Sequence, residues 1–263
     1  MVGVPVLMYH RICRDEVPAD LEFLVSESVF ALQMEYLAAH AYSTVPLRDA
    51  DLFSRDSRGL RKKSVVLTFD DGYRDNLEIA VPILRRFGFT AAVFLVGAFQ
   101  SGSNWWDTMK GLKGESLLRP ADLRVMEQEG VEFGSHTMNH VSLPGLSDDE
   151  MVQELRESKA LLERFLHHPV FSVAYPYGDV NPRVKTCARE AGYSMGFATN
   201  SGPLRTSSDP FEIRRVPMEN RADASYMIWK LSGLDKAFRW TKWSMKRLVG
   251  KHNLHQSELR SSS

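Results

Sequence analysis

The chain has 263 residues, a length that fits one large α/β domain or two small ones. Lysine and arginine together number 33, as do aspartate and glutamate, so the overall charge gives no indication that nucleic acid is a partner. The two cysteines, Cys13 and Cys187, are too few for a disulfide framework or a thiolate zinc site.

Apolar runs and helical periodicities alternate along the chain. Such alternation predicts parallel βαβ units, either closed into a barrel or wound as an open sheet. We expect strands at 4–9, 42–45, 64–67, 90–96, 131–134, 170–175, 193–199 and 213–216, and helices at 28–40, 77–87, 120–129, 147–166 and 182–191.

Helix starts are marked by polar residues. Ser28 can cap the first helix. Ser147 and Glu150 form a capping box, in which each side chain bonds the other residue's backbone. Pro82 lies inside the 77–87 pattern and should kink or divide that helix, because proline cannot donate a helical hydrogen bond.

Residues 97–118 form a long loop that carries Trp105 and Trp106. Loops of this length in a compact domain are usually functional or disordered. Two adjacent indoles suit a sugar-stacking surface, but they would equally suit a cover over the edge of the core. Both readings stay open at this point.

Asp70 and Asp71 follow the apolar run 64–67, and Gly72 permits a turn directly after them. The carboxyl ends of strands are where α/β folds build their sites. Two adjacent acids repel each other, and a divalent metal would offset that repulsion while one acid serves as a ligand and the other as a base. The alternative is a turn with two solvated acids.

His136 and His140 are four residues apart, after the predicted strand 131–134. On a helix or helical turn, this spacing places both rings on one face, within reach of one ion. The pair follows a strand, as the two aspartates do, so both groups should meet at one end of the sheet. Two imidazoles and one carboxylate form a common catalytic metal set that leaves positions open for water and substrate.

In these motifs the sequence resembles the polysaccharide deacetylases that share the NodB homology domain, carbohydrate esterase family 4. Residues 68–72, Thr-Phe-Asp-Asp-Gly, match the family's first motif, and residues 135–140 match its histidine motif. Residues 175–177, Tyr-Pro-Tyr, match the latter part of the third motif. The resemblance extends from about Val4 to Val216. It implies a distorted (β/α) barrel of about seven parallel strands, in a catalytic domain that we place at 1–235.

The resemblance also assigns roles to residues. It implies that Asp71, His136 and His140 bind a divalent metal and that Asp70 is the general base. The backbone N–H of Tyr177 would help to hold the oxyanion. Mixed nitrogen and oxygen ligands favour zinc, with cobalt, nickel and iron compatible.

The third motif departs from the family's pattern. It usually carries an arginine two residues before the proline, where this chain has Ala174. Because that arginine orients the base, another residue must take its role if the enzyme is active. Arg214 and Arg215, on a later predicted strand, are the candidates, and we favour Arg215.

The family's late catalytic histidine has no clean match either, since His252 and His255 lie in a polar tail. Residues 6–11 resemble the N-terminal segment of the branch that de-N-acetylates poly-N-acetylglucosamine. In that branch a histidine of this segment is the general acid, which implies the same role for His10. The alternative is a strand-end histidine bonded to backbone.

The implied function is a metal-dependent hydrolase that removes N-acetyl groups from an N-acetylhexosamine-containing polysaccharide or lipid-linked glycan and releases acetate. Tyr177, Trp105 and Trp106 would contact the glycan. Two alternatives remain: a catalytically impaired carbohydrate-binding protein on the same scaffold, and an amidohydrolase acting on a non-sugar C–N bond.

Residues 236–263 form a basic amphipathic segment followed by a polar tail. Within 236–251, an apolar arc faces six basic residues, with Trp240 and Trp243 among them. This pattern suits either a terminal helix packed on the domain or peripheral contact with an anionic membrane. The N-terminus does not resemble a secretory signal, and no apolar stretch reaches the roughly 18 residues of a membrane span. We therefore expect a cytoplasmic protein, peripheral at the inner membrane if this segment binds lipid.

Overall fold

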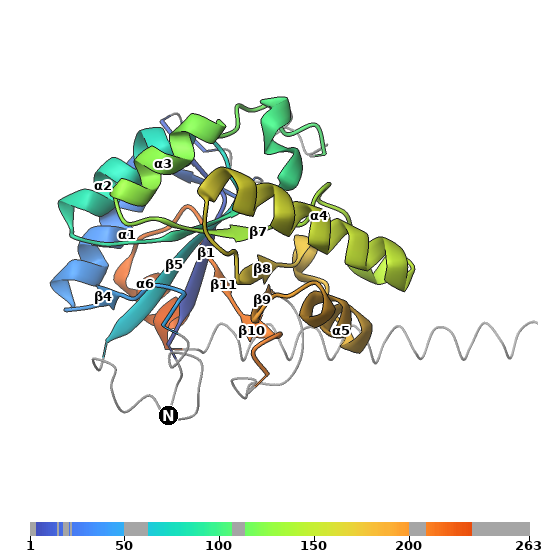
Figure 1. Cartoon of the computed structure of the whole chain (residues 1–263). Coiled ribbons are helices and arrows are strands. Elements are labelled where there is room, and N and C mark those ends of the chain that lie inside the picture. Colours follow the sequence, from blue (N-terminus) through green and yellow to red (C-terminus); the bar gives the residue numbers. More distant parts are fainter. Residues whose placement is uncertain are drawn as a thin grey trace, which may run out of the picture.

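A computed structural model describes residues 4–14, 16–17, 21, 23–49, 63–106, 114–199 and 209–232. In these residues the main sheet has nine strands, and eight of them follow the order β10-β9-β8-β7-β6-β5-β1-β11 (Figure 1). The ninth, β4, pairs with β5, and all pairings are parallel. The strands are β1 (Val6–Tyr9), β4 (Ser43–Thr44), β5 (Ser64–Asp71), β6 (Ala92–Leu95), β7 (Glu132–Ser135), β8 (Ser172–Ala174), β9 (Met195–Ala198), β10 (Ile213–Arg214) and β11 (Val216–Pro217).

The two edges of this sheet are halves of one extended segment. β10 pairs with β9 and β11 pairs with β1, and only Arg215 separates β10 from β11 along the chain. The segment therefore nearly closes the sheet into a barrel. Counting it once reduces the eight strands of the path to seven, so the prediction of a distorted parallel barrel is confirmed.

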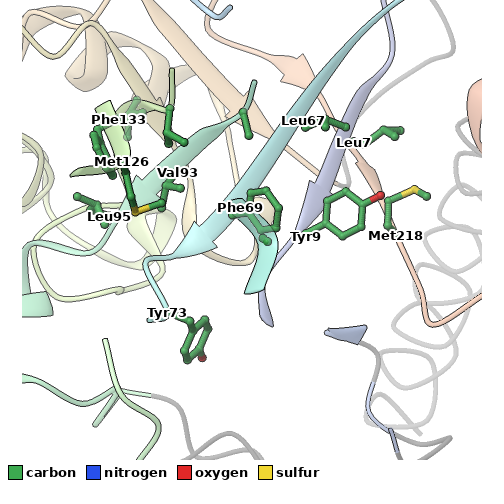
Figure 2. Close-up of a cluster of buried hydrophobic side chains, with 14 of the residues drawn as sticks. Leu7, Tyr9, Leu67, Phe69, Tyr73, Val93, Leu95, Met126, Phe133 and Met218 are labelled. Atoms are coloured by element: carbon green, nitrogen blue, oxygen red, sulfur yellow. The ribbon is translucent and has the colours of Figure 1, made fainter. Parts of the chain in front are cut away.

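Side chains along β5 point alternately to the two faces of the sheet, and each face belongs to a different hydrophobic cluster. Leu67 and Phe69 lie opposite Leu7 and Tyr9 of β1, in the apolar layer shared with the helices (Figure 2). Val66 belongs to a second cluster on the opposite face, together with residues of β6, β8, β9 and β10. Successive strand residues point to opposite faces, so Thr68 and Asp70 share the side of Val66, which the nearly closed sheet encloses.

Six α-helices lie around the sheet in the described part of the chain (Figure 1). They are α1 (Glu27–Ala39), α2 (Val81–Arg86), α3 (Pro120–Gln128), α4 (Asp148–Leu166), α5 (Pro182–Glu190) and α6 (Ala224–Leu231). Shorter elements are the strands β2 (Arg11–Cys13) and β3 (Leu24–Ser26) and the helical turns η2 (Asn76–Ala80), η3 (Gly97–Ser101), η4 (Leu143–Gly145) and η5 (Pro176–Gly178).

The local signals in the sequence are mostly confirmed. The capping box of Ser147 and Glu150 opens α4. The segment around Pro82 is divided, because the π-helical turn η2 ends where α2 begins. The cap of α1 was predicted wrongly, since Ser26 rather than Ser28 accepts the backbone N–H of Val29 at 3.3 Å. Either serine has the side chain that a cap needs, and the position of β3 decides between them.

The predicted boundary between 235 and 236 and the amphipathic segment 236–251 lie outside the described residues. Among the residues that the structure does describe, no helix is both long enough and apolar enough to cross a membrane.

Candidate functional site

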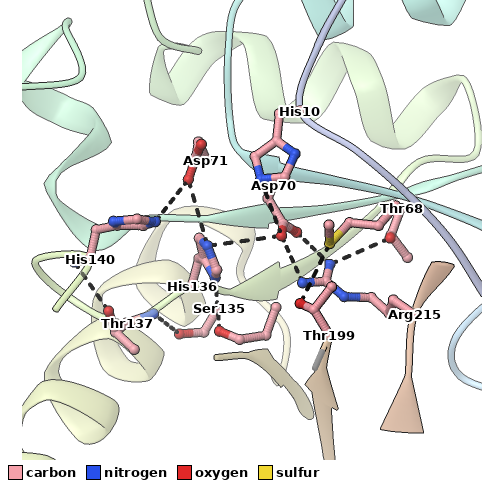
Figure 3. Close-up of polar contacts among 12 residues, drawn as sticks. His10, Thr68, Asp70, Asp71, Ser135, His136, Thr137, His140, Thr199 and Arg215 are labelled. Carbon is pink, nitrogen blue, oxygen red and sulfur yellow. Dashed lines mark hydrogen bonds and ion pairs between the residues drawn. The ribbon is translucent and has the colours of Figure 1, made fainter. Parts of the chain in front are cut away.

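Polar side chains from separate strands meet at the carboxyl end of the barrel (Figure 3). β5 ends in Asp70 and Asp71, and His136 directly follows β7. The end of a parallel sheet brings such residues together although they are far apart in the sequence. The predicted residues gathered here are His10, Asp70, Asp71, His136, His140 and Arg215.

Asp71 and the two histidines form a compact group. The Asp71 carboxylate oxygen Oδ1 lies 3.3 Å from His140 Nε2 and 3.6 Å from His136 Nε2. One ligand atom from each of the three residues lies within 4.8 Å of the others, and no other group of three or more such residues occurs in the described ranges. Two imidazole nitrogens and a carboxylate oxygen are donors that suit zinc and its neighbours.

The protonation of the histidines also fits a metal. His136 Nδ1 lies 2.8 Å from the carbonyl oxygen of Ala174, which can only accept, so Nδ1 carries the proton and Nε2 keeps its lone pair. The pKa of His140 is lowered to about 2, chiefly by burial and also by His136 and His10, whereas Asp70 opposes the shift. Burial also lowers the pKa of His136. Both rings are therefore neutral at pH 7, the form in which imidazole binds metals.

The histidine pair lies on a loop, not on a helix, so the helical reading of its spacing is wrong. Thr137 and His140 have left-handed φ values of 65° and 55°. The Thr137 hydroxyl accepts the His140 N–H at 3.1 Å, and Ser135 Oγ accepts the Thr137 N–H at 3.2 Å (Figure 3). A left-handed residue other than glycine costs about 1–2 kcal/mol, so the surroundings must hold this loop in place.

Asp70 is almost completely buried and forms a two-pronged ion pair with Arg215. Arg215 Nη1 donates to Asp70 Oδ1 at 2.5 Å, and Nη2 donates to Oδ2 at 2.7 Å. Burial alone would raise the pKa of Asp70, but the Arg215 guanidinium outweighs it, with His136 and His10 adding, and holds that pKa well below its usual range. Arg214, the other candidate, donates to Glu212 instead.

His10 lies on the other side of Asp70, with its Nε2 3.9 Å from Asp70 Oδ2. Its ring also packs on Phe23, with 4.7 Å between the centroids. Burial lowers the pKa of His10 to about 4; Asp70 opposes this shift, whereas Arg215 and His136 add to it. The ring therefore points into the site rather than bonding to backbone as the alternative reading supposed.

Aromatic residues flank His140. Its ring lies 5.9 Å from that of Trp106, nearly parallel, and 5.0 Å from that of Tyr177. Trp106 also packs against the main core, whereas Trp105 is 54% exposed and Tyr177 is 58% exposed. Trp106 therefore fits the interpretation of a cover over the core, whereas Trp105 faces outward, where a sugar could reach it.

Two polar residues near the site were not anticipated from the sequence. Asn76 Nδ2 donates to the backbone carbonyl of His10 at 2.9 Å. Glu154 of α4 accepts hydrogen bonds from the loop that carries the histidine pair. Both contacts depend on how helical segments pack against strand ends, and neither residue belongs to a motif.

A family model described as polysaccharide deacetylase matches residues 57–196, which is more than half of the chain. The chain belongs to the polysaccharide deacetylase family. The resemblance seen in the motifs is thereby confirmed.

Three individual proteins of known name also resemble this chain. YxkH of Bacillus subtilis (strain 168) is 29% identical over 213 residues, which cover 81% of this chain and 70% of YxkH. The poly-beta-1,6-N-acetyl-D-glucosamine N-deacetylase of Staphylococcus aureus (strain MSSA476) is 24% identical over 209 residues, 76% of this chain and 69% of that protein. The solved structure of Streptococcus pyogenes deacetylase PplD in complex with acetate aligns with a TM-score of 0.75 at 25% identity, covering 88% of this chain and 98% of that one.

Proposed function

We propose that this family member is a metal-dependent hydrolase that removes N-acetyl groups from an N-acetylhexosamine-containing polysaccharide or lipid-linked glycan and releases acetate. The observation that carries the proposal is the buried pair of Asp70 and Arg215 directly beside the group of Asp71, His136 and His140. The names of two similar proteins, an N-deacetylase of poly-N-acetylglucosamine and a deacetylase solved with acetate, support this choice of reaction.

Asp71, His136 and His140 would hold the divalent ion, with zinc the first choice and cobalt, nickel and iron compatible. When bound, such an ion polarises the acyl oxygen and acidifies a water molecule. Asp70, ionised and fixed by Arg215, accepts the proton of the attacking water. The fork of Arg215 keeps the carboxylate from rotating, which is the role that the family's arginine has at the position of Ala174.

The remaining steps fall to residues around this pair. His10 Nε2 lies 3.9 Å from Asp70 Oδ2. Because its ring is neutral before the reaction, it takes up the proton that Asp70 removes from water and then donates that proton to the leaving amine. The backbone N–H of Tyr177, in a left-handed turn with φ 60°, stabilises the negative charge that develops on the acetyl oxygen when water adds to the acetyl carbon. Cleavage of the C–N bond then yields acetate and a free amino sugar.

Two exposed rings lie near His140: that of Tyr177, 5.0 Å from the His140 ring, and that of Trp105, 6.0 Å from the Trp106 ring. Flat aromatic faces suit the apolar face of a pyranose ring, so we assign them to the glycan, with Trp106 as the inner wall. The catalytic domain spans 1–235 in this proposal, and 236–263 form a basic amphipathic segment with a polar tail, of which 236–251 contact an anionic membrane. An enzyme placed in this way would be cytoplasmic and would act close to a lipid-linked sugar.

Acetate release from N-acetylglucosamine oligomers tests the proposal directly. We expect release that stops with a chelator and returns when zinc is added back. Oligomer binding without acetate release would favour the carbohydrate-binding alternative, although the position of Arg215 removes the main argument for an impaired site. Hydrolysis of small non-sugar amides in preference to the oligomers would favour the amidohydrolase alternative.

A further inference from the structure

The loop between the two histidines is held from both sides. On one side, backbone N–H groups of Gly97 and Ala98 donate to the carbonyls of Thr137 and Met138 at 2.8 and 2.9 Å. A side chain at residue 97 would press on this loop, because a Cβ there would lie 3.1 Å from Met138 Cα.

On the other side lies a single carboxylate, that of Glu154 on α4. Its Oε2 accepts the backbone N–H groups of Met138 and Asn139 at 3.1 and 3.0 Å. Its Oε1 accepts Asn139 Nδ2 at 2.6 Å. Two successive backbone N–H groups aimed at one anion form a concave arrangement typical of anion sites in proteins, and hydrogen bonds to a charged acceptor are stronger than neutral ones.

Glu154 contacts the backbone between the two histidines, so it can affect the distance between their rings. Met138 and Asn139 lie between His136 and His140, and the loop contains two left-handed residues, Thr137 and His140. Such a backbone is disfavoured unless its surroundings hold it. Any relaxation between 137 and 140 would move the His140 ring relative to His136, whose own ring is fixed by the Ala174 carbonyl.

We propose that Glu154 is the positioning residue of the histidine pair: its carboxylate sets the separation of the two rings and thereby the affinity of the site for a divalent ion. This inference rests on the proposed function for the ion itself, but it concerns a residue outside the family's motifs. The competing explanation is an ordinary contact between a helix and a loop that stabilises the fold without affecting the ligands.

The experiment uses the full chain and measures zinc affinity by competition with a chromophoric chelator, together with the visible spectrum of the cobalt-loaded protein. Glu154→Ala should lower zinc affinity on the order of 10- to 100-fold, the range found for residues that orient metal ligands. It should also alter the cobalt spectrum, which reports ligand geometry. The control is Glu157→Ala, which removes an exposed carboxylate from the same helix and should change neither quantity.

Exchanging the carboxylate of Glu154 and the amide of Asn139 tests the hydrogen bond between these two side chains. Glu154→Gln should retain zinc affinity within a few-fold, because the amide oxygen still accepts the two N–H groups and the Asn139 amide can rotate to accept from the new NH₂. Asn139→Asp alone places two carboxylates against each other and should weaken zinc binding. The double variant, Glu154→Gln with Asn139→Asp, should restore it, because the glutamine NH₂ then donates to the aspartate.

Equal zinc affinity in all these variants would overturn the inference. So would a Glu154→Ala protein that melts at a lower temperature without its metal but binds zinc as the wild type does. If Glu154→Ala does not fold, the exchange between 154 and 139 decides the question. A wild type that binds zinc with the expected dependence on Glu154 but releases no acetate would refute the proposed function and leave this inference standing.

Discussion

Arg215 reaches Asp70 with both terminal nitrogens, and each donates to a different carboxylate oxygen, at 2.5 and 2.7 Å. The two residues are 145 positions apart in sequence: Asp70 lies on β5, inside the sheet path, whereas Arg215 joins the two strands at its edges. Arg215 is the residue at which the closing segment passes from β10 to β11. The same residue therefore lies at the closure of the barrel and fixes the proposed base.

Arg215→Ala should lower the free energy of unfolding by about 3–5 kcal/mol, because it leaves the Asp70 carboxylate buried without its partner. Arg215→Lys should lose less, since lysine keeps the charge but not the planar fork. Urea denaturation measures both. The control is Arg221→Ala, which removes an exposed pair with Asp223 and should change the free energy of unfolding little, because solvent screens an exposed ion pair. An Arg215→Ala protein as stable as the wild type would contradict the energetic role of the pair.

Asp70→Asn should keep its zinc and lose acetate-releasing activity by a factor on the order of 10² to 10⁴, the usual contribution of a positioned base. His136→Ala, by contrast, should lose most of its zinc, because it removes a metal ligand. Elemental analysis and acetate release on the same preparations separate the two roles. Stoichiometric zinc in His136→Ala would refute the ligand assignment, and an active Asp70→Asn would refute the base.

His10 should make stability depend on pH in the metal-free protein. Its pKa is about 4 when folded and about 6.5 when unfolded, so the folded state prefers the neutral ring. Between these values the unfolded chain binds more protons. The contribution of His10 is therefore fully present above pH 6.5 and is lost as the pH falls toward 4.

The measurement is the free energy of unfolding of wild type and His10→Gln between pH 7 and 4.5, with chelator present. The wild type should lose more stability than the variant as the pH falls, by up to about 1.4 kcal/mol per pH unit. Because the other histidines are present in both proteins, their titration cancels to first order. Parallel curves would mean that His10 titrates normally in the folded protein.

Much of this site could be predicted because its parts are local. A buried run before Asp70, a strand before His136 and a capping box at Ser147 are patterns of a few residues, and the parallel sheet then brings strand ends together. Arg215 was favoured only because the family's arginine is absent at Ala174. The conformation of the histidine loop could not be predicted, since the spacing of four residues also fits a helix. Glu154 was missed because its contact depends on how α4 packs beside β7, which no short pattern encodes.

The segment 236–251 leads to a prediction that rests on sequence alone. If it contacts membranes, the protein should sediment with anionic but not neutral liposomes, and binding should fall as salt is added. Trp240→Ala with Trp243→Ala should weaken binding, because indoles favour the interface. Equal binding to neutral vesicles, or none to either kind, would leave a terminal helix packed on the domain as the better reading.

Trp105 and Trp106 should have separable effects, because only the first is largely exposed. Trp105→Ala should reduce kcat/KM for N-acetylglucosamine oligomers roughly 2- to 12-fold, the equivalent of one aromatic stacking contact. Its zinc affinity should not change, since Trp106 and not Trp105 stacks on the His140 ring. Trp105→Phe should recover most of the loss, because it restores a flat ring.

Trp106→Ala should instead lower stability as well as zinc affinity, since it opens a gap between the core and His140. Comparing kcat/KM of the two alanine variants for oligomers and for a single N-acetylated sugar shows where the glycan lies. A loss in Trp105→Ala that is confined to the longer substrate places a neighbouring sugar on that indole. If Trp105→Ala handled every oligomer as the wild type does, the exposed ring would have no part in substrate binding, and the argument for a sugar over a small amide would lose its main structural support.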